Sequence, residues 1–387
     1  MTRFTVHASP PITRWDTPGY GRSRTVAHAS SGRIYVVGMM RDYYSESSPY
    51  QHDIPTIWWS DDFGVSWSYE YLADKNLNQQ MHLAIGLGDV VSVVYDANPG
   101  YTYYQEGVPG NWSAPVAPFA LNVQYPSICI DQENTKHIAA DVWFGSAMYY
   151  RSRDTDGNWS AIYRLPDGGG ADITNDNFNR PHIIYSDNNH IYRDGLGIWQ
   201  TPEVFGSSGT NWGSAWDDNS NLHMSFSSNW NVYYRCRYAD TIDPITGDII
   251  PGVYGDLINP VTQTYGGEYA ARYDSRPGIS VDINGVISFV YKSQKYTGST
   301  LYQRIYIMFS NDFGVSWYPA DAPMLLLGDS SNVYFPGLVH SCFDPTARTP
   351  NAGKAYVVCG VNTSRVYYWD MEGYEFPSAV DHYAYFM

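Results

Sequence analysis

The sequence has little of what metal-binding and membrane-spanning proteins need. Its four cysteines, Cys129, Cys236, Cys342 and Cys359, lack the paired spacing of a metal site. Each lies in an apolar, strand-like run, which favours buried free thiols, with a disulfide between Cys342 and Cys359 as the alternative. No run approaches the roughly 18 apolar residues of a membrane span, so we expect no membrane insertion.

Positive charge is also scarce. The chain carries 23 Lys and Arg against 39 Asp and Glu, a formal net charge of -16. Nucleic-acid phosphates would be repelled by this balance, so no nucleic-acid partner is expected. The sequence also lacks a convincing glycine-rich phosphate loop, zinc pattern or Ser-His-Asp arrangement, and we therefore expect no cofactor and no metal.

Long helical periodicity is missing as well, which excludes a helical fold. Abundant instead are aromatic and turn-forming residues, with 36 Tyr, 13 Trp, 34 Gly and 23 Pro. Aromatic enrichment favours strands, and scattered glycine and proline favour many turns. The composition therefore predicts an all-β protein.

One aromatic unit recurs along the chain. The copies are TIWWSDDFGVSW (56–67), TYYQEGVPGNWS (102–113), MYYRSRDTDGNWS (148–160), HIYRDGLGIWQ (190–200), VYYRCRYAD (232–240), IYIMFSNDFGVSW (305–317) and VYYWDMEGYEF (366–376). Two further apolar runs precede most copies. Three strands, a turn and a short fourth strand thus recur about every 45 residues, the length of one propeller blade.

These repeats predict a single domain over 1–387, a seven-bladed β-propeller with four-stranded antiparallel blades; a six-bladed ring is the alternative. The last copy has only three clear strands. We expect the N-terminal run RFTVHAS (3–9) to supply its outer strand and close the ring. The segment 240–274 is predicted to be a long inter-blade insertion, a kind of loop that often has a function.

Two of the turns match S-x-D-x-G-x-x-W. The matching residues are Ser60, Asp62, Gly64 and Trp67, and Ser310, Asp312, Gly314 and Trp317. The aspartate is expected to accept amide hydrogens of its own turn, the glycine to take a positive φ, and the tryptophan to pack beside the neighbouring blade. The pattern resembles the Asp-box, or BNR repeat, of the sialidase-like propellers, whose typical sialidases have six blades. These residues are expected to be structural.

Ligand sites of propellers form where several blades converge, at the rim shared by the strand 2–3 loops. The segments YPSI (125–128), RPHI (180–183), RPGI (276–279) and FPGL (335–338) predict equivalent positions, which would place Arg180 and Arg276 at the channel mouth. The resemblance adds Arg22 and Arg41 of the first blade. Guanidinium groups bind carboxylates in bidentate fashion, so these arginines predict an acidic sugar; pairing with inter-blade aspartates is the alternative.

The resemblance also implies catalytic candidates. The loop DYYSESSPYQHDIPTIWW (42–59) corresponds to the one that carries the acid/base aspartate, for which Asp53 or Glu46 is the nearest residue. Tyr334 is a candidate nucleophile. His52 and His182 are candidates for a propeller polysaccharide lyase, in which a base removes the proton beside a neutralised carboxylate.

Aromatic and histidine side chains complete the candidate set. The expected rim aromatics, suited to stacking on sugar faces, are Trp143, Trp230, Tyr43, Tyr44, Tyr50, Tyr101 and Tyr296. By contrast, His137 and His223 begin strands at recurring positions, which favours a packing role.

The sequence therefore predicts a propeller that binds or hydrolyses an acidic glycan or polysaccharide, either sialic or uronic. Polysaccharide lyase activity is one alternative. Another is a non-catalytic structural or receptor-binding component of a virion or other large assembly, with neighbouring subunits as partners. The N-terminus MTRFTVHASPPITRWD does not resemble a signal peptide, and we expect an extracellular or virion-associated protein without one.

Overall fold

The structure is a computed structural model of the chain. It describes residues 2–8, 25–42, 52–62, 64–73, 77–97, 100–142, 147–206, 209–228, 231–242, 249–261, 277–282, 285–297, 300–320, 323–330, 337–340, 355–361 and 365–370. In some strands only the backbone is described. Among these residues no helix is long and apolar enough to cross a bilayer, and no group of His, Cys, Asp and Glu is arranged to hold a metal ion.

Most of the described chain forms four-stranded antiparallel sheets. The first three sheets contain β2 (Val26–His28), β3 (Ile34–Asp42), β4 (His52–Ser60) and β5 (Ser68–Tyr71); β6 (Leu77–Ile85), β7 (Val91–Ala97), β8 (Tyr101–Val108) and β9 (Asn111–Trp112); and β10 (Gln124–Ile130), β11 (Lys136–Asp141), β12 (Met148–Arg153) and β13 (Tyr163–Leu165). The next two contain β14 (Asp172–Asn175), β15 (Pro181–Tyr185), β16 (Asn189–Tyr192) and β17 (Glu203–Val204); and β23 (Gly278–Val281), β24 (Ile287–Thr297), β25 (Thr300–Ser310) and β26 (Met324–Ser330). The last contains β27 (Gly337–His340), β28 (Ala355–Val361) and β29 (Arg365–Asp370), with the N-terminal β1 (Thr2–Ala8) as its outer strand.

Four smaller pieces complete the secondary structure of the described residues. A three-stranded sheet contains β18 (Thr210–Trp216), β19 (Leu222–Ser228) and β20 (Asn231–Arg237). A short ladder joins β21 (Thr241–Ile242) to β22 (Ile249–Ile250). Two 3-10 turns, η1 (Leu87–Asp89) and η2 (Ser186–Asn188), each link two strands of a blade.

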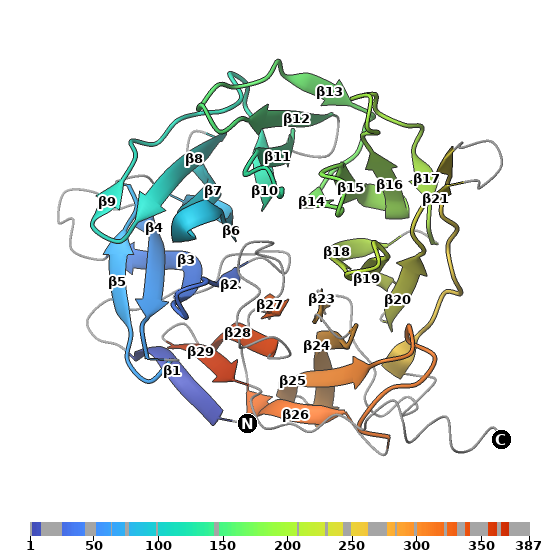
Figure 1. Cartoon of the computed structure of the whole chain (residues 1–387). Coiled ribbons are helices and arrows are strands. Elements are labelled where there is room, and N and C mark those ends of the chain that lie inside the picture. Colours follow the sequence, from blue (N-terminus) through green and yellow to red (C-terminus); the bar gives the residue numbers. More distant parts are fainter. Residues whose placement is uncertain are drawn as a thin grey trace.

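The sheets stand around a common centre, with the first strand of each sheet innermost (Figure 1). These inner strands contact one another in sequence and close a circle through β2, β6, β10, β14, β18, β23 and β27. The predicted β-propeller is therefore confirmed.

The prediction of seven four-stranded blades needs a correction, because six complete four-stranded blades are seen among the described residues. The remaining repeat is the three-stranded sheet β18–β20. Its outer edge meets the chain after β22 through two isolated bridges, Tyr234 to Ile258 and Arg237 to Tyr254. An irregular segment thus takes the place of a fourth strand. These bridges involve the described part of the expected insertion 240–274.

The N-terminal strand closes the ring as predicted. β1 pairs antiparallel with β29, with Phe4 opposite Tyr368, so the two ends of the chain share one sheet (Figure 1). Because this sheet joins residues from both ends of the sequence, it removes the open position that a ring made from one continuous chain would leave.

The core lies between neighbouring sheets, where the inward faces of adjacent blades meet. One cluster joins Met148 and Tyr150 of β12 to Ile173, Ile183 and Tyr185 of the following blade, all almost fully buried. Burying one such side chain contributes roughly 1.5–3 kcal/mol, so each blade is stable only beside its neighbours. Cys129 and Cys236 are buried thiols outside any disulfide, as predicted. Cys342 lies outside the described residues, as does the side chain of Cys359.

The two S-x-D-x-G-x-x-W turns are alike in detail. In the first, the Asp62 carboxylate accepts hydrogen bonds from the Ser60 hydroxyl at 2.8 Å and the Ser66 amide at 2.8 Å, and Gly64 has φ 90. Trp67 Nε1 donates to the Gly64 carbonyl at 2.9 Å. In the second copy, the Trp317 ring packs edge-on against Tyr234 of the neighbouring blade. The spacing therefore has the structural reason expected from the sequence.

A second repeated turn joins strands one and two. In DQENTKH (131–137) the Asp131 carboxylate accepts amide hydrogens from Glu133 and Thr135, and it contacts His137 Nε2 at 3.0 Å. DNFNRPH (176–182) and DDNSNLH (217–223) form the same turn, with the histidine six residues after the aspartate. The packing role predicted for His137 and His223 is confirmed.

These turns also bind one blade to the next. Asn134 and Asn179 occupy the left-handed region, with φ 64 and 61, and each side-chain oxygen accepts an amide hydrogen from the preceding blade's turn. Asp89 does the same toward Ser30 and Ser31. Asn and Asp tolerate this conformation better than most residues, so one residue both shapes the turn and holds its neighbour. We call this side of the ring, which carries the strand 1–2 and 3–4 turns, the turn face.

Candidate functional site

The predicted site residues fall into three groups in the structure. Several lie outside the described residues, namely Arg22, Glu46, Trp143, Trp230, Arg276 and Tyr334. Arg41, His52 and Asp53 lie in strands whose backbone is described. Arg180, His182 and the predicted rim aromatic Tyr101 are described with their side chains.

The second group meets at one end of the first blade. In the β3–β4 hairpin, Arg41 pairs with Asp53 and Asp42 pairs with His52. β3 begins after the turn at 29–33, and β4 ends at the turn that starts with Ser60, so these four residues lie at the opposite end of the hairpin. We call that side of the ring the rim. The expected rim position of Arg41, His52 and Asp53 therefore agrees with the register.

Arg180 and His182 do not lie at the rim, and the predicted equivalence of RPHI with the other segments is wrong. Pro181 starts β15, the second strand of its blade, directly after the turn at 176–180. Tyr125, by contrast, lies in the first strand β10. Proline follows Arg180 in one segment and Tyr125 in the other, but the strands β15 and β10 run in opposite directions along their blades. Arg180 is therefore placed on the turn face.

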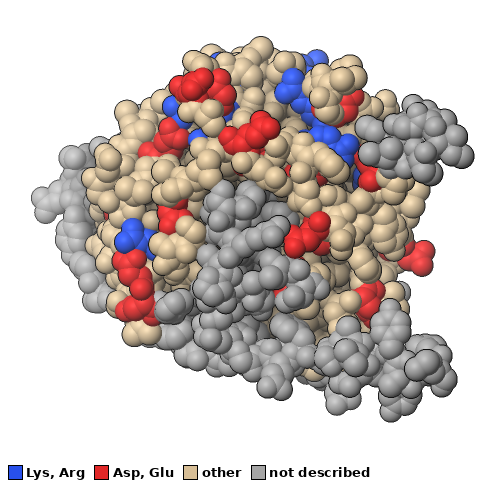
Figure 2. All heavy atoms as spheres, in the orientation of Figure 1, with Lys and Arg blue, Asp and Glu red and all other residues tan. Residues whose placement is uncertain are grey.

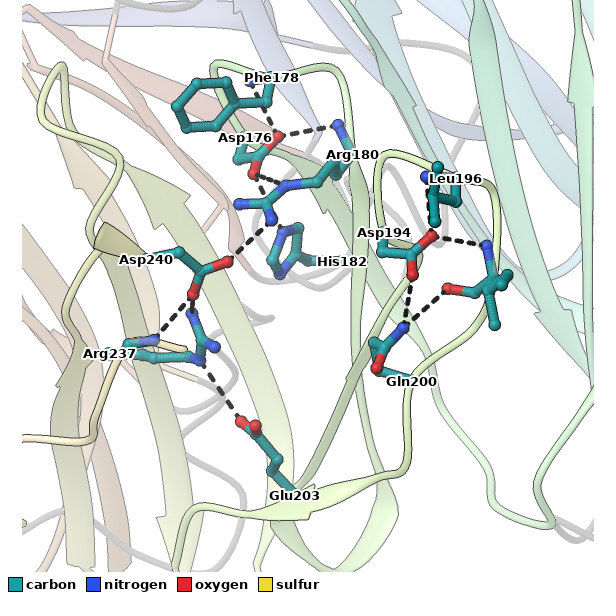
Figure 3. A network of polar contacts seen from close by, with 12 residues as sticks. Asp176, Phe178, Arg180, His182, Asp194, Leu196, Gln200, Glu203, Arg237 and Asp240 are labelled. Carbon is teal, nitrogen blue, oxygen red and sulfur yellow. Dashed lines mark hydrogen bonds and ion pairs between the residues drawn. The ribbon is translucent and has the colours of Figure 1, made fainter. Parts of the chain in front are cut away.

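Arg180 belongs to a network of charged side chains between two blades (Figure 3). Its Nε donates to Asp176 at 2.6 Å, and its Nη1 donates to Asp240 at 2.8 Å. Asp240 also accepts from Arg237 Nη1 at 3.0 Å, and Arg237 Nε reaches Glu203 at 3.3 Å. The alternative weighed for this arginine, pairing with inter-blade aspartates, is what the structure shows.

Aromatic side chains complete the network into a closed circuit. Tyr254 donates to Glu203 at 2.9 Å and lies 2.9 Å from His190 Nδ1. His190 Nε2 lies 2.9 Å from His182 Nδ1, and His182 Nε2 lies 3.5 Å from Asp176, where the circuit began. Eight side chains from the fourth blade, β20 and the segment after it are thus linked in sequence.

Burial fixes the charge states in this circuit. Burial lowers the pKa of His182 to about 3, although the nearby Asp176 carboxylate acts in the other direction. Burial alone would raise the pKa of Glu203, but hydrogen bonds from His190 and Tyr254 and the charge of Arg237 lower it to about 2. Neutral histidines, two guanidinium groups and three carboxylates therefore give the circuit one net negative charge at neutral pH.

This circuit braces the ring, and both of its arginines are paired with carboxylates. Arg237 Nη2 is buried and has no hydrogen-bond partner among the residues that the structure describes. Arg180 and Arg237 also lie over the ring of Tyr192, at 5.6 and 5.3 Å from its centroid. Sequence reasoning did not predict Glu203, Arg237, Asp240 and Tyr254, because their partners come from other strands. The one available signal was the Asp-to-His spacing, which His182 shares with the packed His137 and His223.

A second series of polar side chains links neighbouring inner strands of the ring. The hydroxyl of Ser127 lies 3.2 Å from His82 Nδ1 and donates to Asp172 at 3.3 Å, and Ser214 donates to the other oxygen of Asp172 at 2.5 Å. His82, Ser127 and Asp172 are each 45 residues apart, at the same position of successive blades. Ser127 stands between the other two, whereas a nucleophilic serine needs the histidine in the middle. This series is a link between inner strands.

The rim ends of the first and second strands of two blades also carry buried polar side chains. Gln80 and Asp96 lie at this end of the second blade, and Gln124 and Asp141 at this end of the third. Each exposes 6% of its surface or less. On the face shown in Figure 2, acidic side chains lie at several places around the ring.

Comparison with known proteins shows the fold. No protein-family profile matches the chain, and no curated protein matches its sequence. A streptogramin B lyase structure is 13% identical over 95% of this chain and 96% of that one, with a TM-score of 0.53. A catalytically inactive virginiamycin B lyase from Staphylococcus aureus, with quinupristin, is 13% identical over 95% and 98%, with a TM-score of 0.52.

Similarity to a sialidase is more distant. The Trypanosoma rangeli sialidase in complex with the inhibitor DANA is 10% identical over 91% of this chain and 55% of that one, with a TM-score of 0.46. The chain is a β-propeller whose fold is similar to that of the two lyase structures. At these identities the similarity concerns the fold alone.

Proposed function

We propose that this protein is a sialidase-like propeller that binds an acidic glycan, sialic or uronic, at the rim. The observation that carries the proposal is the register of the β3–β4 hairpin, which sets Arg41 opposite Asp53 and Asp42 opposite His52. The hairpin brings a cation suited to a carboxylate, a carboxylic acid and an imidazole to one end of the first blade. The turn-face arginine Arg180 is already bound to two aspartates and takes no part.

The roles of the hairpin residues follow from their chemistry. Arg41 binds the sugar carboxylate, and Asp53 is the acid/base group if the bound glycan is hydrolysed. The lyase alternative assigns removal of the proton beside the carboxylate to His52. His52 is next to Asp53 in β4 and therefore belongs to the opposite face of the hairpin from Arg41, so a lyase reaction fits this hairpin less well than hydrolysis. Arg22, Arg276, Glu46, Tyr334, Trp143 and Trp230 remain proposed contributors on the sequence argument alone.

A matched pair of variants tests the binding proposal. Arg41 and Arg33 stand at the two ends of β3, and Arg33 on the turn face binds Asp61 through Nε at 2.5 Å and Nη2 at 3.1 Å. Titration of the full chain with 3′-sialyllactose and with cellobiouronic acid is expected to show binding of one of them. Arg41→Ala should weaken that binding at least tenfold, while Arg33→Ala leaves it unchanged.

Equal binding by Arg41→Ala and the unmodified chain would contradict this proposal. Failure of both probes to bind would favour the alternative of a structural component in a larger assembly. If binding is found, product analysis by mass spectrometry separates the reactions. Addition of water to the fragments indicates hydrolysis, an unsaturated uronide indicates lyase chemistry, and loss of either product in Asp53→Asn or His52→Gln assigns the group.

A further inference from the structure

Three glutamines are buried among the described residues, and they differ in how their side-chain amides are bonded. Gln105 is fully partnered, because its Oε1 accepts from the Tyr95 hydroxyl at 2.7 Å and its Nε2 donates to the carbonyls of Leu72 and Ser113. Gln80 and Gln124 are 3% and 6% exposed, and the Oε1 of each has no hydrogen-bond partner among the residues that the structure describes. A buried amide oxygen without a donor costs about 1–3 kcal/mol.

Both unpartnered oxygens belong to the same part of the rim. Gln80 lies near the start of β6, where its backbone amide donates to Asp96 Oδ1 at 2.6 Å. Gln124 starts the adjacent inner strand β10. The contact between His82 and Ser127, a few residues further along each strand, holds the two strands side by side. The two glutamines therefore reach the rim at the boundary of the second and third blades.

The backbone around these glutamines leaves room for their side chains. Gly100 ends the turn between β7 and β8 with φ 103, and a Cβ there would lie 2.8 Å from Gln124 Nε2 and 2.5 Å from Asn122 Oδ1. Any other residue at this position would displace the Gln124 amide. The glycine is thus required both by its conformation and by the approach of these two side chains.

Two aromatic residues flank the same boundary. Tyr101 follows the glycine at the start of β8, and Tyr125 follows Gln124; both are partly exposed. Tyr125 has φ 52, a left-handed conformation that a bulky residue adopts only where its surroundings impose it. Such outliers cluster at ligand sites. This boundary therefore combines buried amide acceptors with partly exposed aromatic rings, the two kinds of group that a sugar engages through its hydroxyl donors and its apolar face.

We propose that the rim between the second and third blades is a subsite for a neutral sugar unit, whose hydroxyl groups donate to Gln80 Oε1 and Gln124 Oε1. The free groups are acceptors, so they select a donor and cannot bind a carboxylate. This inference deepens the proposed function and rests on it: the acidic unit lies at the first blade near Arg41, and the neutral unit of the same glycan lies at the boundary of the second and third blades.

The test uses Gln80→Leu and Gln124→Leu, which keep the approximate shape and remove the acceptor, with Gln105→Leu as the matched control. The probes are 3′-sialyllactose and cellobiouronic acid, their neutral parts lactose and glucose, and the free acids N-acetylneuraminic and glucuronic acid. Each rim variant should weaken binding of the larger acidic probe three- to tenfold, about one hydrogen bond, and leave binding of the free acid unchanged. Gln105→Leu should leave both unchanged.

Thermal unfolding without ligand provides an independent readout. Gln80→Leu and Gln124→Leu remove an amide that lacks a donor, so their melting temperatures should equal or exceed that of the unmodified chain. Gln105→Leu breaks three hydrogen bonds and should melt lower. If the two rim variants melt as low as Gln105→Leu, or bind the larger probe normally, ordered water alone satisfies these oxygens and the subsite proposal is overturned.

The two proposals fail in different ways. Binding that depends on Arg41 but not on the glutamines overturns the subsite and leaves the acidic-glycan proposal standing. Binding of lactose or glucose that depends on the glutamines, with no preference for the acidic probes, supports the subsite and contradicts the acidic-glycan proposal. No binding of any probe contradicts both.

Discussion

The two faces of the ring are both rich in polar side chains, yet they use them differently. On the turn face, the carboxylates of Asp62, Asp131, Asp176 and Asp217 are bonded to amides of their own turns. At the rim, Gln80 and Gln124 are buried, and each keeps one acceptor without a donor among the described residues. A buried polar atom without a partner needs an explanation, and for the two rim glutamines we propose a bound sugar.

The largest expected effect comes from opening the closed circuit on the turn face. Arg180→Ala leaves the buried Asp176 and Asp240 without their common cation, and should lower the free energy of unfolding by about 3–5 kcal/mol. Urea denaturation measures this change. Arg164→Ala, which breaks an exposed pair with Asp167, should cost less than about 1 kcal/mol. An Arg180→Ala protein that is stable but no longer binds glycan would reverse the assignment of the two faces.

Acid should weaken the same circuit. Burial lowers the pKa of His182 to about 3 from its ordinary 6.5, so the folded chain takes up this proton later than the unfolded chain. Stability therefore falls as the pH drops from about 6.5 toward 3, by about 2 kcal/mol between pH 7 and pH 5 for this histidine. Urea denaturation at both pH values measures the fall, and His182→Gln should reduce it. An unchanged pH dependence in the variant would contradict this role for His182.

A smaller effect is expected from the contact between neighbouring turns. Asn179→Gly retains a residue suited to φ 61 and removes only the hydrogen bond that Asn179 Oδ1 accepts from the backbone N–H of Gln132. This should lower the free energy of unfolding by about 1 kcal/mol. Asn179→Ala should cost about 1–2 kcal/mol more, because alanine is strained in the left-handed region. Comparison of the two by thermal unfolding separates the inter-blade bond from the backbone conformation. An Asn179→Gly variant that unfolds at the same temperature as the unmodified chain would show that this bond does not hold the blades together.

The sequence predicted the repeat, the propeller and the closure by the N-terminal strand because these depend on local patterns. In the S-x-D-x-G-x-x-W turns, the partners of the hydrogen bonds lie within eight residues of one another, and the aromatic strands recur at intervals of one blade. The missing fourth strand beside β20 could not be predicted in this way, since VYYRCRYAD (232–240) resembles the other copies up to the point where the chain leaves the sheet.

The site was harder to predict for a related reason. RPHI and YPSI share a proline, but a proline can precede either of two strands that run in opposite directions, so Arg180 was assigned to the wrong face. Gln80 and Gln124 carry no motif. Their distinction from Gln105 depends on partners in other strands, and only the folded arrangement shows which of the three lacks a donor.

A crystal structure of the protein soaked with 3′-sialyllactose or cellobiouronic acid tests the central claim most directly. The account predicts sugar density at the rim, with the carboxylate near the end of the β3–β4 hairpin and hydroxyl groups within hydrogen-bonding distance of Gln80 Oε1 and Gln124 Oε1. Sugar bound on the turn face, or a rim where these two oxygens contact only water while the sugar binds elsewhere, would contradict it.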